Sequence, residues 1–391
     1  MRLIVIGGGV IGLSVAWRSA QHGLEVTVID PAPGSGASST AAGMLAPVTE
    51  LHFEGRELLT LDLESAARYP DFAAELTEAT GIDIGFRRCG TVQAAWDAAD
   101  LAALRQLHAF QVSLGLDAHM LTSRELREAE PALAAGLPGG LWAGGDHQVD
   151  NRRLHAALLE AVRRAGVTLV PHAATELIGD DERVTGVVTD DGTRFEADVT
   201  VLAAGTWSRR IGGLPDELLP PVRPVKGQTL RLRAAAGLLR HVVRGAVKGH
   251  PVYVVPRDDG TLVVGASSEE AGFDLRPRAG AVYELLRDAA TLVPELTEAE
   301  FVEVSTSLRP GSPDNAPLIG PGGRGGLIVA TGHYRNGILL TPVTADEVTR
   351  LIVDGTPGDL IRPFDPLRFA RGRTARSPLP ATVSTTGGGT R

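Results

Sequence analysis

Residues 2–30 constrain the fold of this chain more than any other stretch. Residues 2–6, Arg-Leu-Ile-Val-Ile, form a short β-branched run that predicts a buried parallel strand, and three glycines follow it. Apolar residues recur at three- and four-residue steps from Val10 to Ala20, which predicts a helix that ends near Gly23. A second β-branched run at 25–30 predicts another strand. The chain therefore opens with a strand-helix-strand unit.

The turn inside this unit carries the pattern Gly7-x-Gly9-x-x-Gly12, which is typical of dinucleotide-binding sites. With 47 glycines in 391 residues, chance alone gives roughly 0.7 matches, and residues 320–325 match too, without a helix after them. The first match has the required context, because a strand precedes it, a helix follows, and Asp30 ends the second strand. The alternative is a glycine-rich turn that binds nothing.

Each glycine of the pattern has a physical role in such a site. Gly7 permits the tight turn, Gly9 lets a pyrophosphate approach the backbone, and Gly12 lets helix and strand pack closely. The amides of Val10 and Ile11 would point the positive end of the helix at the phosphates. At the end of the second strand, the acidic side chain would bind the adenosine ribose.

The rest of the chain continues the α/β pattern and then changes to alternating strands. Helices are expected at 57–79, 97–115, 151–165 and 337–353, buried strands at 167–170, 200–204 and 327–331, and antiparallel strands at 229–233, 252–256 and 261–265. We predict an α/β fold (α+β overall), in which a Rossmann-like FAD-binding domain carries an inserted antiparallel-sheet substrate domain.

The predicted domains are discontinuous in sequence. The FAD-binding domain takes residues 1–85, 140–215 and 305–360, and the substrate domain takes 86–139 and 216–304. Residues 363–391 hold several arginines among Pro, Ser, Thr and Gly, a composition that predicts an unstructured tail.

Charge and cysteine content narrow the function classes. A formal net charge of −9 disfavours nucleic-acid partners. Cys89 is the only cysteine, and the ten histidines show no ligand spacing, so neither a disulfide nor a metal site is expected. The apolar run at 3–17 is broken by glycines and is too short for a membrane span. We expect a cytoplasmic protein without membrane partners, and the sequence leaves homo-oligomerisation open.

The dinucleotide motif suits NAD and FAD alike, and three further segments favour FAD. Residues 38–44 place small hydroxyl residues and a glycine after the second strand. Gly205 follows the buried strand at 200–204, where doubly wound sheets bind ligands. Residues 333–339 would open the last helix, whose positive end would stabilise negative charge on a reduced ring. Each segment taken singly is more often an ordinary turn.

Several motifs together give the chain a resemblance to a known family. They run in order from residue 1 to about 355 and comprise 6–12 (Ile-Gly-Gly-Gly-Val-Ile-Gly), 41–45, 224–228, 253–257 with 263–266, 308–314, and 332–339 (Gly-His-Tyr-Arg-Asn-Gly-Ile-Leu). The chain resembles the flavin-dependent amine oxidases of the D-amino-acid oxidase family. Among them it is most similar to the glycine oxidases of thiamine biosynthesis.

The resemblance implies three substrate-binding residues. Arg309 falls on the family's carboxylate-binding arginine, and a planar guanidinium suits a bidentate carboxylate. Tyr253 corresponds to an active-site tyrosine that hydrogen-bonds the carboxylate and shields the site. Arg335 aligns with a second arginine near substrate and flavin. Without the resemblance, Arg309 would be interpreted as part of a surface ion pair and Tyr253 as a tyrosine of the β-sheet core. Arg335 would be interpreted as a solvated charge at the start of a helix.

The resemblance and the motifs together predict which residues bind FAD and imply that it is bound non-covalently. Cys89 lies away from the region where sarcosine oxidases attach flavin, and we interpret it as a small core or strand residue. The expected FAD-binding residues are Gly7, Gly9, Val10, Ile11, Gly12, Asp30, Ser38, Ser39, Ala42, Gly43, Met44, Thr175, Gly205, His333, Tyr334, Arg335, Asn336, Gly337, Ile338 and Leu339.

The implied reaction is oxidative deamination of glycine. Hydride transfer from Cα of the neutral amine to flavin N5 would give an imine, and molecular oxygen would reoxidise the flavin to give hydrogen peroxide. No side-chain acid or base is required. The imine would feed thiazole formation by thiazole synthase, or hydrolyse to glyoxylate and ammonia.

One residue departs from the family pattern and leaves the substrate open. Ser268 stands where some relatives place a methionine or another apolar residue, so sarcosine and small D-amino acids stay open as substrates. A flavin dehydrogenase of the same fold with another electron acceptor is the enzyme alternative. A binding module that senses NAD or FAD is the non-enzyme alternative.

Overall fold

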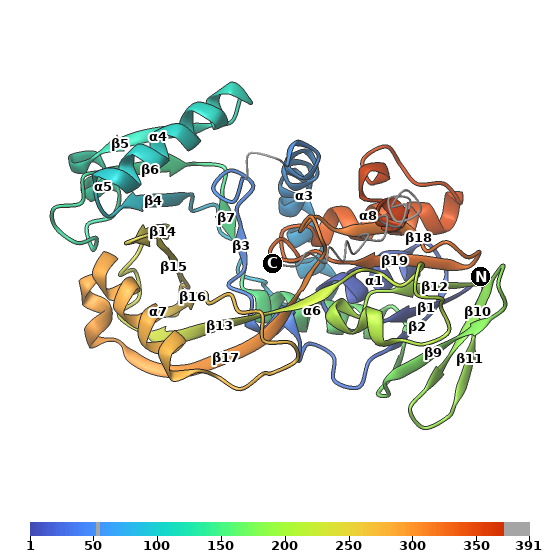
Figure 1. The fold of residues 1–391 in the computed structure, drawn as a ribbon. Coiled ribbons are helices and arrows are strands. Elements are labelled where there is room, and N and C mark those ends of the chain that lie inside the picture. The colour runs from blue at the N-terminus through green and yellow to red at the C-terminus, as the bar shows by residue number, and fades with distance from the viewer. Residues whose placement is uncertain (52–54, 371–391) are drawn as a thin grey trace, which may run out of the picture.

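The computed structural model describes residues 1–51 and 55–370, and two large sheets organise them (Figure 1). The first sheet has six strands in the order β18-β19-β12-β1-β2-β8. Its strands are β1 (Arg2–Ile6), β2 (Glu25–Ile29), β8 (Thr168–Val170), β12 (Val199–Leu202), β18 (Leu318–Pro321) and β19 (Leu327–Thr331). All neighbours pair in parallel except β18 and β19. The predicted α/β fold class, with its opening β-α-β unit, is confirmed.

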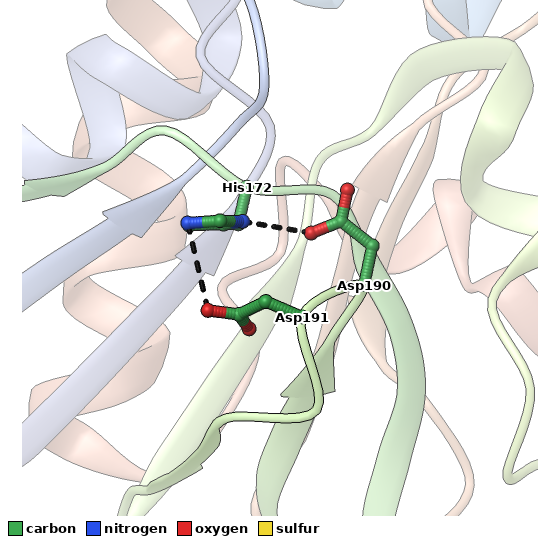
Figure 2. Close-up of side chains that lie close together, drawn as sticks. All are labelled: His172, Asp190 and Asp191. Atoms are coloured by element: carbon green, nitrogen blue, oxygen red, sulfur yellow. Dashed lines mark hydrogen bonds and ion pairs between the residues drawn. The ribbon is translucent and has the colours of Figure 1, made fainter.

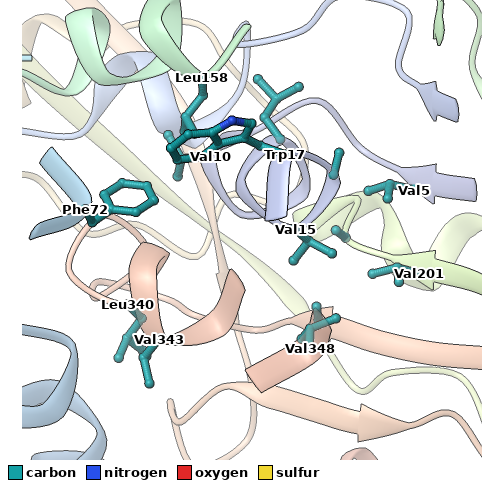
Figure 3. Close-up of a cluster of buried hydrophobic side chains, with 14 of the residues drawn as sticks. Val5, Val10, Val15, Trp17, Phe72, Leu158, Val201, Leu340, Val343 and Val348 are labelled. Carbon is teal, nitrogen blue, oxygen red and sulfur yellow. The ribbon is translucent and has the colours of Figure 1, made fainter. Parts of the chain in front are cut away.

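Both faces of this sheet are covered, which explains its continuous apolar strands. Leu3 and Val5 of β1 point into a core formed with the helices α1 (Val10–Gln21), α3 (Arg56–Thr80), α6 (Asn151–Arg164) and α8 (Thr341–Asp354). Figure 3 shows part of this core, including Trp17 of α1 and Phe72 of α3. Ile4 of β1 faces the opposite side, toward a small sheet of β9 (Ala174–Gly179), β10 (Val184–Thr189) and β11 (Arg194–Glu196).

The second sheet has eight strands in the order β17-β13-β16-β15-β14-β4-β6-β5. These strands are β4 (Thr91–Ala95), β5 (Ala118–Thr122), β6 (Gly139–Ala143), β13 (Arg223–Arg233), β14 (Val242–Val247), β15 (His250–Pro256), β16 (Thr261–Gly265) and β17 (Glu300–Gly311). The neighbours are antiparallel except β4 and β14, which pair in parallel. One face packs on α7 (Ala279–Leu292), and α4 (Ala98–Ser113) and α5 (Ser123–Ala129) pack near β5 and β6.

Two of these strands cross the predicted domain boundaries. β6 spans the boundary drawn at residue 139 and pairs with β4 and β5, and β17 spans the one drawn at 304 and pairs with β13. A strand cannot be divided between two sheets without losing its ladder hydrogen bonds. We therefore propose that the substrate domain includes β6 and β17 in full, with the rest of the division as predicted.

Two predicted ends of elements are wrong. The last helix begins at Thr341 and not near Gly337, because residues 336–340 form a turn and Pro342 occupies the first helical turn, where its missing N–H costs nothing. The predicted tail begins too early. Two 3₁₀ turns occupy Arg362–Phe364 and Pro366–Phe369, and Phe364 is buried. Residues 371–391 of that tail lie outside the described residues.

The elements not yet named are short. They are α2 (Ala37–Thr40), β3 (Met44–Leu45), β7 (His147–Gln148) and the 3₁₀ helices Gly205–Arg210 and Pro294–Glu298. α3 has 25 residues and ends at Gly81 in the left-handed conformation, which glycine adopts without a Cβ penalty. None of the described helices combines the length and the apolar composition needed to cross a membrane.

The contact between β1 and α1 gives the first prediction. A Cβ at Gly12 would lie 1.9 Å from the carbonyl oxygen of Gly7, a backbone atom that cannot move aside as a flexible side chain could. Gly12→Ala should therefore push α1 away from β1, lower the free energy of unfolding by about 1–3 kcal/mol, and weaken FAD binding. Denaturant unfolding measures the change. Gly280→Ala, at a helical glycine with open space around it, is the control; equal stability of the two variants would contradict the prediction.

Candidate active site

A cavity of about 1080 Å³ lies between the two large sheets. Its walls include the carboxyl ends of β1, β2, β12 and β19, where open α/β sheets bind their ligands. The opposite wall comes from the second sheet. Arg244, Tyr253, Gly265 and Thr229 are successive cross-strand partners there, so they share one face, and all but Gly265 line the cavity.

Most of the predicted FAD-binding residues line this cavity. They are Gly7, Gly9, Val10, Ile11, Asp30, Ser38, Ala42, Gly43, Met44, Gly205 and residues 333–339. Gly12 does not line it, because it packs against Gly7. Ser39 and Thr175 do not line it either: their hydroxyls donate to the carbonyls of Gly36 and Val188. Alanines 173 and 174 line the cavity beside Thr175.

Hydrogen bonds fix the glycine turn from both sides. The Asp30 carboxylate accepts from Gly8 N at 2.6 Å and from Ala32 N at 2.8 Å. Ser38 Oγ accepts from Val10 N at 3.1 Å, so the first amide of α1 has a side-chain partner. The turn is therefore held in shape by Asp30 and Ser38 as well as by its glycines.

The cavity fits a dinucleotide such as FAD. Gly205 adopts φ +55°, and a Cβ there would meet no atom within 4 Å, so the backbone is open to a ligand. Among the described residues, the backbone N–H groups of Gly337, Ile338 and Leu339 have no hydrogen-bond acceptor, although these residues line the cavity. Unpaired amides and bare glycines suit a phosphate and a ring with carbonyl oxygens.

The three predicted substrate-binding residues lie on the same cavity. Nη1 of Arg309 donates to the carbonyl of Ser267 at 3.0 Å. A Cβ at Gly227 would lie 2.3 Å from that nitrogen, so the guanidinium occupies the space that Gly227 leaves free. Burial raises the pKa of Tyr253, with the charges of Arg309 and Arg335 opposing the rise. Both arginines are thus within electrostatic reach of Tyr253.

Tyr334 and Ser268 complete this end of the cavity. Tyr334 adopts φ +48°. Burial opposes ionisation of Tyr334, but hydrogen bonds with Arg335 and Ser268 and the charges of Arg335 and Arg309 outweigh it and lower the pKa. Ser268, which departs from the family pattern, therefore contacts Tyr334, and the wall of the cavity at this point is polar.

Sequence reasoning missed an ion pair in the same wall. Arg244 of β14 pairs with Glu50 at 2.7 Å, and each side chain is only 16% exposed. Buried Asp146 holds the segment before Glu50 by accepting from the amides of Val48 and Thr49. Burial raises the pKa of Asp146 to about 6 despite these hydrogen bonds. The register that places Arg244 opposite Tyr253 could have indicated the arginine, but nothing in the sequence indicated its partner.

Comparison with known proteins identifies the family. Residues 2–351 match the model of the DAO family, described as FAD dependent oxidoreductase. The chain belongs to this family. The predicted resemblance and the FAD cofactor are confirmed. In this FAD-dependent oxidoreductase, the glycine turn lines the same cavity as Arg244, Arg309 and Arg335.

Relatives of this oxidoreductase carry several names. The bifunctional protein ThiO/ThiG of Synechocystis is 37% identical over 94% of this chain and 54% of its own length. The chain thus spans about half the length of the ThiO/ThiG relatives. The glycine oxidase of Geobacillus kaustophilus is 38% identical over 89% of this chain and 92% of its own. The hydrogen cyanide synthase subunit HcnC of Pseudomonas aeruginosa is 30% identical over 98% of both.

Solved structures agree with these relatives. The glycine oxidase of Geobacillus kaustophilus superposes with a TM-score of 0.87 at 36% identity, over 94% of this chain and 99% of its own. The iminodiacetate oxidase of Chelativorans gives 0.83 at 25% identity, over 93% of this chain and 99% of its own. The fold therefore extends over nearly the whole length of both structures.

One cluster in the oxidoreductase has the composition of a metal site, where none was expected. His172 lies between Asp190, 2.8 Å from Nδ1, and Asp191, 3.6 Å from Nε2 (Figure 2). The Asp191 carboxylate already accepts from Thr189 and Thr193, and these hydrogen bonds lower its pKa to about 2. The carboxylate stabilises the turn between β10 and β11 of the small sheet, and the cluster gives no reason to assign a metal.

Buried His333 gives a pH prediction. Burial lowers its pKa to about 3, and Nε2 lies 3.1 Å from Thr344 Oγ1. The unfolded chain binds a proton below pH 6.5 that the folded chain excludes, so stability falls as pH falls from 6.5 toward 3. Between pH 7.5 and 5.0, the loss should be about 2 kcal/mol greater in the wild type than in His333→Gln.

Urea unfolding of the apoprotein at the two pH values measures this difference. His22→Gln, at an exposed histidine, controls for the loss of an imidazole from the surface. A wild type and His333→Gln with the same pH dependence would show that the folded protein accommodates a charged imidazole at this position.

Proposed function

We propose that this chain is an FAD-dependent oxidase of glycine and of small N-substituted glycines. Glycine, water and molecular oxygen would give glyoxylate, ammonia and hydrogen peroxide, with an imine as the first product. The observation that carries the proposal is the placement of Arg309 and Tyr253 on the cavity that also contains the glycine turn of α1. Glycine oxidases 34–38% identical to this chain support it.

The side chains of the cavity would bind and orient the amino acid. Arg309 would hold the carboxylate through its guanidinium, and Tyr253 would donate a hydrogen bond to the same group. FAD, when bound against the glycine turn, supplies the acceptor for the two electrons and the hydrogen of the Cα–H bond. No acid or base from the chain is needed for a neutral amine, so the contribution of the protein is proximity and charge.

Substrate size and the fate of the imine are the finer parts of the proposal. Ser268 and Tyr334 make the wall polar where some relatives place an apolar residue, so the proposal includes sarcosine as a substrate. The ThiO/ThiG relatives support transfer of the imine from glycine to a thiazole synthase, which would be a partner protein. HcnC, which matches over 98% of this chain, favours an alternative outcome in which a second two-electron oxidation by molecular oxygen and loss of carbon dioxide convert the imine to cyanide.

A substrate panel tests the proposal. Purified protein reconstituted with FAD is mixed with glycine, sarcosine, D-alanine or iminodiacetate in air, and peroxide, ammonia and cyanide are measured. Peroxide and ammonia from glycine are expected. Flavin that glycine bleaches without oxygen, but that yields no peroxide in air, would indicate a dehydrogenase with another acceptor. Protein without flavin absorbance near 450 nm would overturn the oxidase assignment.

Arg309→Leu tests the carboxylate contact. Loss of a charge-assisted hydrogen-bonded pair is worth roughly 1.5–3 kcal/mol, so the KM for glycine should rise about 10- to 150-fold while flavin content stays unchanged. Steady-state peroxide kinetics and the 450 nm absorbance measure the two effects. Arg233→Leu, at an exposed arginine on the same sheet, is the control. A wild-type KM in Arg309→Leu would remove this residue from the site.

Gly227→Ala tests the same contact without removing the charge. Gly227 has ordinary strand geometry, so alanine is compatible with the backbone, but its Cβ would displace the end of the Arg309 side chain. We expect a severalfold higher KM for glycine, with a smaller loss of stability than in Gly12→Ala, because a flexible side chain and not the backbone must move. An unchanged KM would mean that the guanidinium acts from a different position.

A further inference from the structure

One face of α3 directs three buried polar side chains at the turn of residues 336–340. Asp62, Ser65 and Tyr69 are spaced by three and four residues, so they form a stripe along the helix. Ser65 and Tyr69 are fully buried, and Asp62 is 6% exposed. We call these residues the α3 stripe. Buried polar groups are costly unless they are paired, so their partners indicate what the stripe does.

Each member of the stripe contacts the 336–340 turn. The hydroxyl of Tyr69 donates to the carbonyl of Ile338 at 3.1 Å, and that of Ser65 donates to the carbonyl of Leu339 at 2.6 Å. Asn336 Nδ2 donates to Asp62 Oδ2 at 3.2 Å. Burial raises the pKa of Asp62 well above its usual range, with the charges of Glu50 and Asp146 adding to the effect. The stripe therefore fixes the turn at three points.

These bonds also set the direction of the amides in the turn. In a trans peptide, the C=O and the N–H point in opposite directions. Because the carbonyl of Ile338 points at Tyr69, the N–H of Leu339 points away from α3. Among the described residues this N–H has no acceptor, whereas the next one, of Leu340, donates to Asn336 O at 2.8 Å.

The turn lies between α3 and the cavity. Residues 336–339 line the cavity, whereas none of the three stripe residues does. An amide that points away from α3 is therefore on the cavity side of the turn. A buried amide without an acceptor is rare in folded proteins unless a ligand or water satisfies it.

We propose that the α3 stripe is a positioning element for the cofactor, which orients the 336–340 turn so that its unpaired amides, that of Leu339 in particular, donate to an electron-rich oxygen of the flavin ring. The proposal rests on FAD binding in this cavity and does not depend on which amine is oxidised. An amide donor at such an oxygen favours the reduced ring, because reduction adds negative charge there.

Tyr69→Phe tests the proposal with little change in packing, because the ring keeps its contacts with Phe72 and Phe86. Without the hydroxyl, the peptide between Ile338 and Leu339 is free to rotate. We expect about tenfold weaker FAD binding, the equivalent of one hydrogen bond. The midpoint potential of the bound flavin should also become more negative. Titration of apoprotein with FAD and dye-coupled reduction of the holoenzyme measure the two effects.

Two further variants make the result interpretable. Ser65→Ala removes the second donor to the turn, at the neighbouring peptide, whose N–H is already bonded to Asn336 O. It should shift both quantities in the same direction to a smaller extent, and it carries the test alone if Tyr69→Phe does not fold. Thr77→Val is the control, because the Thr77 hydroxyl donates only within α3, to the carbonyl of Ala73. The melting temperature of each apoprotein separates loss of stability from loss of positioning.

The outcomes distinguish this proposal from the proposed function. Variants that lose apoprotein stability, but match Thr77→Val in FAD affinity and midpoint potential, would show that the stripe only supports the fold and would overturn the positioning role. A wild-type protein that binds no FAD would overturn the oxidase assignment and this proposal together. If the wild type releases peroxide from glycine, but the Tyr69 and Ser65 variants keep its FAD affinity and midpoint potential, the positioning role alone would be overturned.

Discussion

The close approach of α1 to β1 is the constraint on which the rest of the structure depends. Gly12 lies against the carbonyl of Gly7, where even one methyl group would overlap backbone atoms. This contact places the first turn of α1 at the carboxyl edge of the six-stranded sheet, beside the ends of β2 and β12. The side chains of Asp30 and Ser38 accept hydrogen bonds from the amides of Gly8 and Val10. The residues that follow β2 therefore hold the turn between β1 and α1 in place.

The second sheet converts this edge into a closed site. Its cross-strand partners align side chains from distant parts of the sequence, because residues that are paired across neighbouring strands share a face. Arg244, Tyr253 and Thr229 stand in one such row, and Arg309 on β17 reaches the same cavity over Gly227. The glycine turn predicted to bind the dinucleotide thus lies at the first sheet, and Arg309 and Tyr253, predicted to bind the substrate, lie on the second.

Local patterns in the sequence located five of the six strands of the first sheet, all but β18, and were insufficient for much of the site. The glycine turn, α1 and α6 follow from periodicity and turn chemistry, which are local. The family resemblance located Arg309 and Tyr253 on the cavity. The pair of Glu50 with Arg244 could not be predicted, because it depends on strand register and on a loop that buried Asp146 holds from almost a hundred residues away.

Residues 333–339 of the predicted site show a second feature that sequence patterns did not predict correctly. These residues were expected to open the last helix, and they form a turn instead, with α8 starting at Thr341. The turn leaves three consecutive amides, those of residues 337–339, without an acceptor among the described residues, as the first turn of a helix would. The polar residues that hold it, 62, 65 and 69, look like an ordinary amphipathic pattern in the sequence, and only the fold brings them to the turn.

The charges around Tyr253 argue for the chemical class of the substrate. Burial raises the pKa of this tyrosine, the charges of Arg309, Arg244 and Arg335 oppose the rise, and that of Glu50 adds to it. Glu50 pairs with Arg244, so positive charge remains in excess at the side of the cavity that carries Arg309 and Arg335. A small molecule with a carboxylate and a neutral amine balances this excess, whereas an amine without a carboxylate would leave a guanidinium desolvated and unpaired, which is costly. The electrostatics of the wall therefore support the proposal that the substrate is an amino acid and not a simple amine.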